Sequence, residues 1–92
     1  RMVRFIIKDR SFENTLGRAD SLANRLRTQQ VDGVTISTAT ACVIPRIADR
    51  FRFEITATAS TSKTLQAFLA MVRKSIKPSR DLTIDVDPIS ML

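Results

Sequence analysis

Five basic side chains lie in or beside two segments whose residues alternate between apolar and polar. They are Arg4, Lys8, Arg46, Arg50 and Arg52. In an extended strand every second residue shares a face, so Arg50 and Arg52 point the same way, as do Arg4 and Lys8. Arginine presents a planar fork that fits phosphate oxygens. If the two segments are neighbours in a sheet, these side chains form a basic patch suited to the DNA backbone.

The same polar face has a second interpretation, in which the basic side chains pair across strands with Glu54, Asp85 and Asp87. Asp85 and Asp87 are two residues apart, a spacing that also occurs in metal sites and acid–base pairs. Neither a histidine nor a third oxygen ligand accompanies them, so ion pairing is favoured for the two aspartates. For the basic patch, phosphate contact and cross-strand pairing both stay open.

The composition narrows the chemistry further. The chain has 92 residues, with 15 Lys plus Arg against 9 Asp plus Glu, and a formal net charge of +6. This excess favours a polyanionic partner. The chain has no histidine and a single cysteine, Cys42. These counts exclude Ser-His-Asp and Cys-His catalysis, zinc sites built on imidazole or several thiolates, and an internal disulfide. We therefore expect no metal or other cofactor in this chain. No apolar run approaches the roughly 20 residues of a membrane span, so we expect no membrane segment. A short secreted domain usually needs disulfides, so we expect a location inside a cell.

The elements that position the basic side chains follow from apolar periodicity. Alternation predicts strands at 2–8, 34–43, 50–57 and 82–86, and helical spacing predicts helices over 12–29 and from 62 up to Pro78. Ser11 and the cluster 60–62 are expected N-caps, and Pro45 predicts a bend over 44–46.

The resulting order, β-α-β-β-α-β, predicts one α+β domain over 1–92 of the split β-α-β-β-α-β kind. Its four-stranded, mainly antiparallel sheet carries two helices on one face. Strands 2–8 and 50–57 are the central neighbours, and the five phenylalanines are expected in the core. No aromatic residue is expected on the polar face, so DNA contact should be directed at the backbone and independent of sequence.

Three stretches carry a resemblance to a known family: residues 34–36 followed by 44–53, then 65–69, and then 84–92 with its Asp-Val-Asp-Pro. Together they resemble the C-terminal domain of the PriA family, the primosomal N-prime proteins of bacterial replication restart. The terminal stretch is the most specific part, because it occurs in the right order and at the right place.

Several residues depart from the family's pattern. Thr38-Ala39 stands where the family usually has Gly-Pro, Ala48-Asp49 replaces Arg-Gly, and Phe51 replaces a tyrosine. The loop before the third predicted strand therefore carries one positive charge fewer and one negative charge more than is usual.

The resemblance implies a non-catalytic fragment of a longer chain, working in the bacterial cytoplasm. Its partners would be forked or single-stranded DNA, the acidic tail of single-stranded-DNA-binding protein, and other domains of the parent. The parent would be an ATP-dependent helicase, with its ATP, magnesium and zinc sites elsewhere. Gln66 matches a tail-binding glutamine of the family, whereas Ser62 stands in place of an arginine whose charge Lys63 would replace.

Two other function classes use the same topology. An acylphosphatase-like enzyme needs an arginine in a glycine-rich phosphate cradle after the first strand and an asparagine on the second strand. Residues 8–11 contain no glycine, and 34–43 contain no asparagine. A small regulatory ligand-binding domain is the third possibility, although its sheet is usually less basic.

Overall fold

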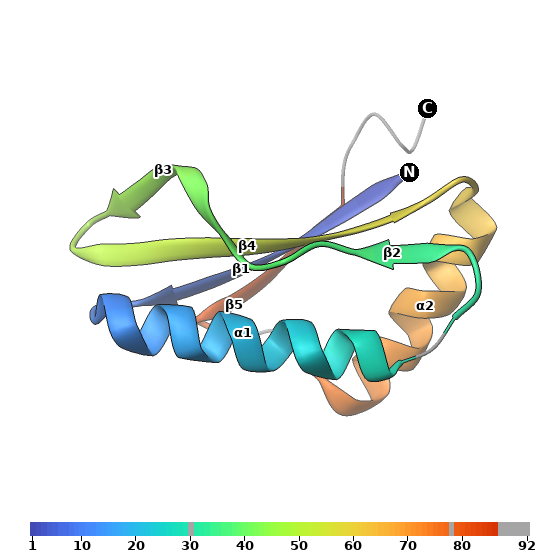
Figure 1. The fold of residues 1–92 in the computed structure, drawn as a ribbon, viewed down its shortest axis with the longest axis horizontal. Coiled ribbons are helices and arrows are strands. Elements are labelled where there is room, and N and C mark those ends of the chain that lie inside the picture. The colour runs from blue at the N-terminus through green and yellow to red at the C-terminus, as the bar shows by residue number, and fades with distance from the viewer. Residues whose placement is uncertain (30, 78, 87–92) are drawn as a thin grey trace.

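The computed structural model describes residues 1–29, 31–77 and 79–86, with the side chains of 43–45 excepted. Its elements are β1 (Met2–Asp9), α1 (Phe12–Thr28), β2 (Val34–Ile36), β3 (Thr40–Ile47), β4 (Arg50–Ala59), α2 (Ser62–Ser75) and β5 (Leu82–Val86) (Figure 1). None of the described helices is long and apolar enough to cross a membrane. Pro78, Asp87 and the end of the chain, on which several of the predictions rest, lie outside the described residues.

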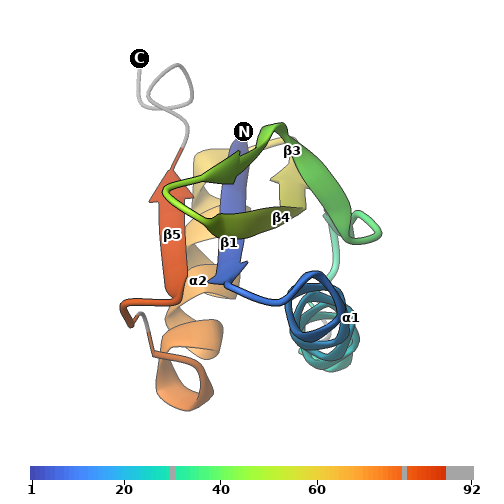
Figure 2. The same cartoon turned by 90° about the vertical axis from the view of Figure 1, so that its left-hand side faces the viewer.

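The strands form one antiparallel sheet in which β1 lies between β4 and β5, and β4 also pairs with β2 and β3. The predicted central position of β1 and β4 is therefore confirmed, as is an α+β domain with two helices and an open antiparallel sheet. Figure 2 views the molecule from the end where α1 begins and where the turn between β3 and β4 lies.

One face of the sheet builds the core together with both helices. Val3, Phe5 and Ile7 of β1 lie opposite Ala57, Ile55 and Phe53 of β4, and all six are buried. From the helices, residues at helical spacing complete this core, including Leu22 and Leu26 of α1 and Phe68 and Val72 of α2. The expected N-caps are in place, since the Ser11 hydroxyl accepts from Asn14 N and the Thr61 hydroxyl accepts from Thr64 N.

The segment predicted as one strand over 34–43 is divided. The first part, β2, ends at Ile36, and β3 begins at Thr40 and continues through Pro45, where a bend was expected. Between them Ser37 binds Thr56 twice, donating from its N–H to the Thr56 carbonyl and accepting the Thr56 N–H at its hydroxyl. Pro45 lies in the stretch where the pairing of β3 with β4 shifts register. Because proline has no N–H to donate, an irregular stretch is where a strand tolerates it.

Candidate nucleic-acid interface

The face of the central strands that points away from the core carries four of the five predicted basic residues, which are Arg4, Lys8, Arg50 and Arg52. Lys8 of β1 lies directly opposite Arg52 of β4, and Arg4 lies opposite Thr56. Directly opposite residues share a face, and alternation places Ile6 and Glu54 with them. We call this surface, made of Arg4, Ile6, Lys8, Arg50, Arg52, Glu54 and Thr56, the open face. Ile6 within it is buried.

Arg4 is held by carboxylates on both of its neighbouring strands. Its Nη2 lies 2.7 Å from Asp85 Oδ2, and its Nη1 lies 3.6 Å from Glu54 Oε2. The hydrogen bond to Asp85 is the main reason that the pKa of Arg4 is raised. The cross-strand pairing interpretation therefore holds for Arg4 and Asp85, and two carboxylates offset the Arg4 charge.

Lys8 and Arg52 form a different arrangement, because two cations stand directly opposite each other on the central strand pair. Like charges at such positions destabilise a sheet, by up to about 1 kcal/mol. Within the part of the chain that the structure describes, the Lys8 ammonium takes part in no ion pair. An anion bound at this position would relieve the repulsion between the two side chains.

Arg50 shares the outward face of β4 with Arg52, but its charge is held in an ion-pair network at the end of the sheet. Its Nη1 lies 2.7 Å from Asp81 Oδ1, just before β5. Asp81 is also 3.7 Å from Arg18 of α1, which lies 3.2 Å from Asp9. The Arg50 charge is thus used to join β4 to the turn before β5, and it is partnered by a carboxylate, unlike that of Lys8.

Arg46 lies on the opposite side of the sheet from Lys8 and Arg52. Its Cα pairs with that of Phe51, and its guanidinium carbon lies 5.3 Å from the centre of the Phe51 ring. That ring meets Phe12 of α1 edge-on, with 5.7 Å between centroids, which places Arg46 on the helix side. Its other partner is Asp49, at 3.2 Å. The structure therefore separates Arg46 from the expected five-residue patch. The other four residues share the open face, where Arg4 and Arg50 are paired with carboxylates.

Phe12 also departs from expectation. All five phenylalanines were expected in the core. Phe5, Phe53 and Phe68 are buried, whereas Phe51 is only partly buried and half of the Phe12 surface (50%) is exposed. Phe12 lies at the first position of α1, where only one side of its ring meets Phe51 and Phe53. Cys42 is buried as expected of a small strand residue, and burial raises the pKa of its thiol.

The residues predicted to bind a protein tail lie on α2. Both Gln66 and Lys63 are exposed, and Gln66 lines a hollow of about 390 Å³ together with Leu69, Ala70, Arg73 and Val86. We call this the α2 hollow. Arg73 went unnoticed as a partner of Gln66, although a separation of seven residues places both on one helix face.

Arg1 places a further cation at the start of α2. The Nε of Arg1 donates to the Ser62 hydroxyl at 2.8 Å. The two residues are 61 positions apart, and no local pattern in the sequence signals that contact.

Among the described residues no group of three or more potential ligands of the His, Cys, Asp or Glu type is placed to hold a metal ion. Comparison with protein-family models finds no match to this chain, and comparison with curated proteins finds none either.

Proposed function

We propose that this chain is a non-catalytic domain that binds the phosphate backbone of DNA through its open face, independently of base sequence. The observation that carries the proposal is the juxtaposition of Lys8 and Arg52 on the central strands. A phosphate bound between two cationic side chains at directly opposite positions would contact both of them.

Charge and surface chemistry support the same conclusion. The net charge of +6 favours approach to a polyanion. The described residues of the open face include no aromatic side chain on which a base could stack. Contacts there would be made to phosphate oxygens, which carry no sequence information. Single strands and the arms of a fork both offer such oxygens.

We further propose that the domain is of the PriA C-terminal kind, with the split β-α-β-β-α-β arrangement in which β2 and β3 are two parts of one interrupted strand. Both pair antiparallel with β4 on the side away from β1, which supports this assignment. In such a protein the ATP, magnesium and zinc sites belong to other domains of the parent helicase, and the setting is the bacterial cytoplasm.

The proposed protein partner is the acidic tail of single-stranded-DNA-binding protein, bound at the α2 hollow. Leu69 and Val86 offer apolar surface to a hydrophobic chain end, and Arg73 offers a charge to its carboxylates. Arg1, at Ser62, adds a second cation at the start of α2. A tail peptide should therefore bind more weakly to the Arg73→Gln variant than to the wild type. Equal affinities would show that the α2 hollow is not the binding site for the tail.

The decisive variants for DNA binding lose the same charge from different surfaces. Lys8→Gln with Arg52→Gln removes two cations from the open face, and Arg46→Gln with Lys63→Gln removes two that lie elsewhere. In a fluorescence anisotropy titration with a fork, we expect the first pair to weaken binding about tenfold and the second to have a much smaller effect. Equal losses would show that net charge alone matters, and would contradict the open face as the site.

A further inference from the structure

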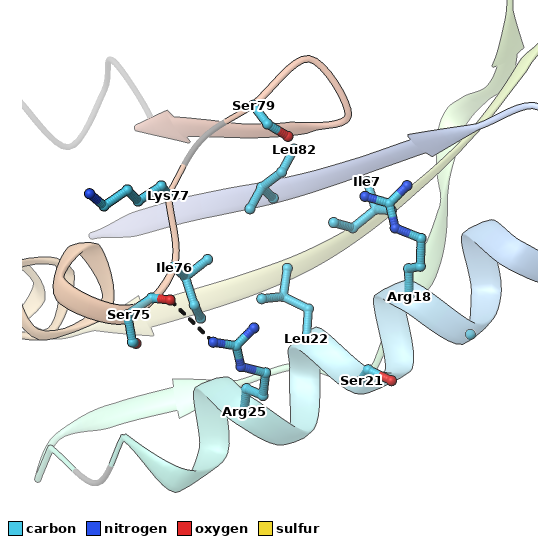
Figure 3. A pocket seen from close by; sticks show the side chains of 11 residues that line it. Ile7, Arg18, Ser21, Leu22, Arg25, Ser75, Ile76, Lys77, Ser79 and Leu82 are labelled. Atoms are coloured by element: carbon cyan, nitrogen blue, oxygen red, sulfur yellow. Dashed lines mark hydrogen bonds between the residues drawn. The ribbon is translucent and has the colours of Figure 1, made fainter.

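A groove on the helix side of the molecule, far from the open face in the fold, has a separate chemistry. It lies between α1 and the segment from the end of α2 to the start of β5, and has a volume of about 420 Å³ (Figure 3). Volumes of about 300–1,000 Å³ are typical of small-ligand sites. We call it the helix groove. Its described lining consists of Ile7, Gly17, Arg18, Ser21, Leu22, Arg25, Ser75, Ile76, Lys77, Ser79 and Leu82.

The polar lining of the helix groove suits an anion. Arg18, Ser21 and Arg25 recur at helical spacing on one face of α1, and Ser75 and Ser79 lie across from them. No carboxylate lines the groove among the residues described. Hydroxyl and guanidinium groups are donors to phosphate oxygens, and charge-assisted bonds of this kind are the stronger ones.

The two arginines are already oriented by contacts within the protein. Arg25 Nη2 donates to the Ser75 carbonyl at 3.2 Å, which fixes it at the C-terminal end of α2 (Figure 3). Arg18 Nη1 lies 3.2 Å from Asp9 Oδ2, so its charge is partly offset. Lys77 points away from both arginines in Figure 3. Arg25, whose partner is a neutral carbonyl, is therefore the principal anion-binding group.

The floor of the helix groove is apolar. Ile7, Leu22, Ile76 and Leu82 are all at least 92% buried from solvent. A ligand that consists of a phosphate alone would make no contact with these apolar side chains. The combination of a guanidinium and hydroxyls at the rim with an apolar floor fits a phosphate that carries a flat, partly apolar body.

We propose that the helix groove binds a nucleoside 5′-phosphate, with the phosphate at Arg25 and Ser21 and the base against Leu22 and Ile76. The chemistry is the same for a free nucleotide and for the 5′-phosphorylated end of a DNA strand. This site is separate from the open face, so it does not depend on backbone binding there.

The first experiment is a titration followed by amide chemical shifts. Deoxyadenosine monophosphate should shift Ser21, Ile76 and Ser79 saturably, whereas deoxyadenosine and inorganic phosphate should each bind at least about tenfold more weakly. A 5′-phosphorylated oligonucleotide is compared with its unphosphorylated form, and tighter binding of the phosphorylated strand identifies the strand end as the source. If inorganic phosphate binds as tightly as the nucleotide, or if no shift saturates, the proposal is overturned.

Substitutions inside and outside the helix groove test whether the nucleotide binds there. Arg25→Gln should weaken nucleotide binding by about 10- to 100-fold, the range expected for one charged hydrogen bond. Arg27 is two residues after Arg25 in α1 and is not among the residues that line the helix groove. Arg27→Gln should therefore leave the affinity for the nucleotide within twofold of the wild type. Because Arg25→Gln also loses its bond to Ser75, Ser21→Glu is a second test that adds a repelling charge at an exposed position. Unchanged affinity in Ser21→Glu and Arg25→Gln would refute the site. Lys8→Gln with Arg52→Gln should leave nucleotide binding intact, whatever it does to fork binding.

Discussion

A glycine stands at a helical position that favours alanine, and an alanine stands at a turn position that favours glycine. Gly17 lies inside α1, and a Cβ added there meets no atom within 4 Å. Ala48, in the turn between β3 and β4, has φ of 51°, in the left-handed region that favours glycine. We therefore expect Gly17→Ala and Ala48→Gly each to stabilise the fold.

The magnitudes come from different sources. Glycine in a helix interior costs about 0.8–1.0 kcal/mol relative to alanine, so Gly17→Ala should raise the free energy of unfolding by about that amount. Alanine in the left-handed region costs about 1–2 kcal/mol, from which the greater unfolded-state freedom of glycine, about 0.5–1 kcal/mol, is subtracted. Ala48→Gly should therefore yield about 0–1.5 kcal/mol, with a midpoint near 0.75 kcal/mol. Because the two residues are at separate places in the fold, the effects should add.

Urea unfolding followed by circular dichroism measures these changes, and thermal unfolding checks them. The double variant should gain about 0.8–2.5 kcal/mol, which corresponds to a rise in Tm of about 3–20 °C for a domain of this size. Gly33→Ala is the matched control, because Gly33 has φ of 89° and its added Cβ would lie 3.4 Å from Thr64 Cγ2. That variant should lose stability. A destabilised Ala48→Gly, or a neutral Gly33→Ala, would refute this reasoning about the turns.

Three further predictions concern single side chains. The pKa of Asp9 is lowered, first by the N–H of Ser11 and then by Arg18, so its contribution is present above the unfolded-state pKa and is lost as pH falls through the folded-state value. Asp9→Asn should therefore flatten the acid side of the curve of Tm against pH; an equally steep decline would exclude Asp9 as a cause. Cys42, buried with a raised thiol pKa, should react with a thiol reagent at neutral pH much more slowly than it does in urea, and equal rates would contradict its burial. Thr15 is fully buried and donates its hydroxyl to the Ser11 carbonyl at 2.6 Å, so Thr15→Val should cost about 1 kcal/mol of unfolding free energy, measured in urea; no loss would show that this bond adds nothing to stability.

Local patterns were sufficient for both helices, for β1, β4 and β5, and for most of the core, but not for the division of 34–43 into β2 and β3. Alternation of apolar residues in β1 and β4 predicted both strands and which of their faces is buried, because that period depends only on strand geometry. The hydroxyl side chains before α1 and α2 predicted the helix starts for a similarly local reason. These inferences need no knowledge of distant contacts.

The ion-pair partners and positions of the basic side chains could not be predicted from local patterns. Arg4 is separated by 81 residues from Asp85, and Arg50 by 31 residues from Asp81, so their pairing depends on which strands meet and in what register. The position of Arg46 depends on the register shift within β3, and strand alternation carries no information about such a shift. The prediction for Phe12 was wrong because its spacing along α1 is that of a core residue. Phe12 is the first residue of the helix, and half of its surface is exposed there.

The central claim is that Lys8 and Arg52 contact DNA phosphates, and the salt dependence of binding tests it most directly. Fork and single-stranded DNA are titrated over a range of salt concentrations, and the logarithm of the association constant is plotted against the logarithm of salt concentration. Each lost phosphate contact reduces the slope by about 0.7–0.9. We predict that Lys8→Gln with Arg52→Gln makes the slope shallower by about 1.4–1.8, and that Arg46→Gln with Lys63→Gln leaves it nearly unchanged. A slope that is the same in the open-face variant and the wild type would contradict the account.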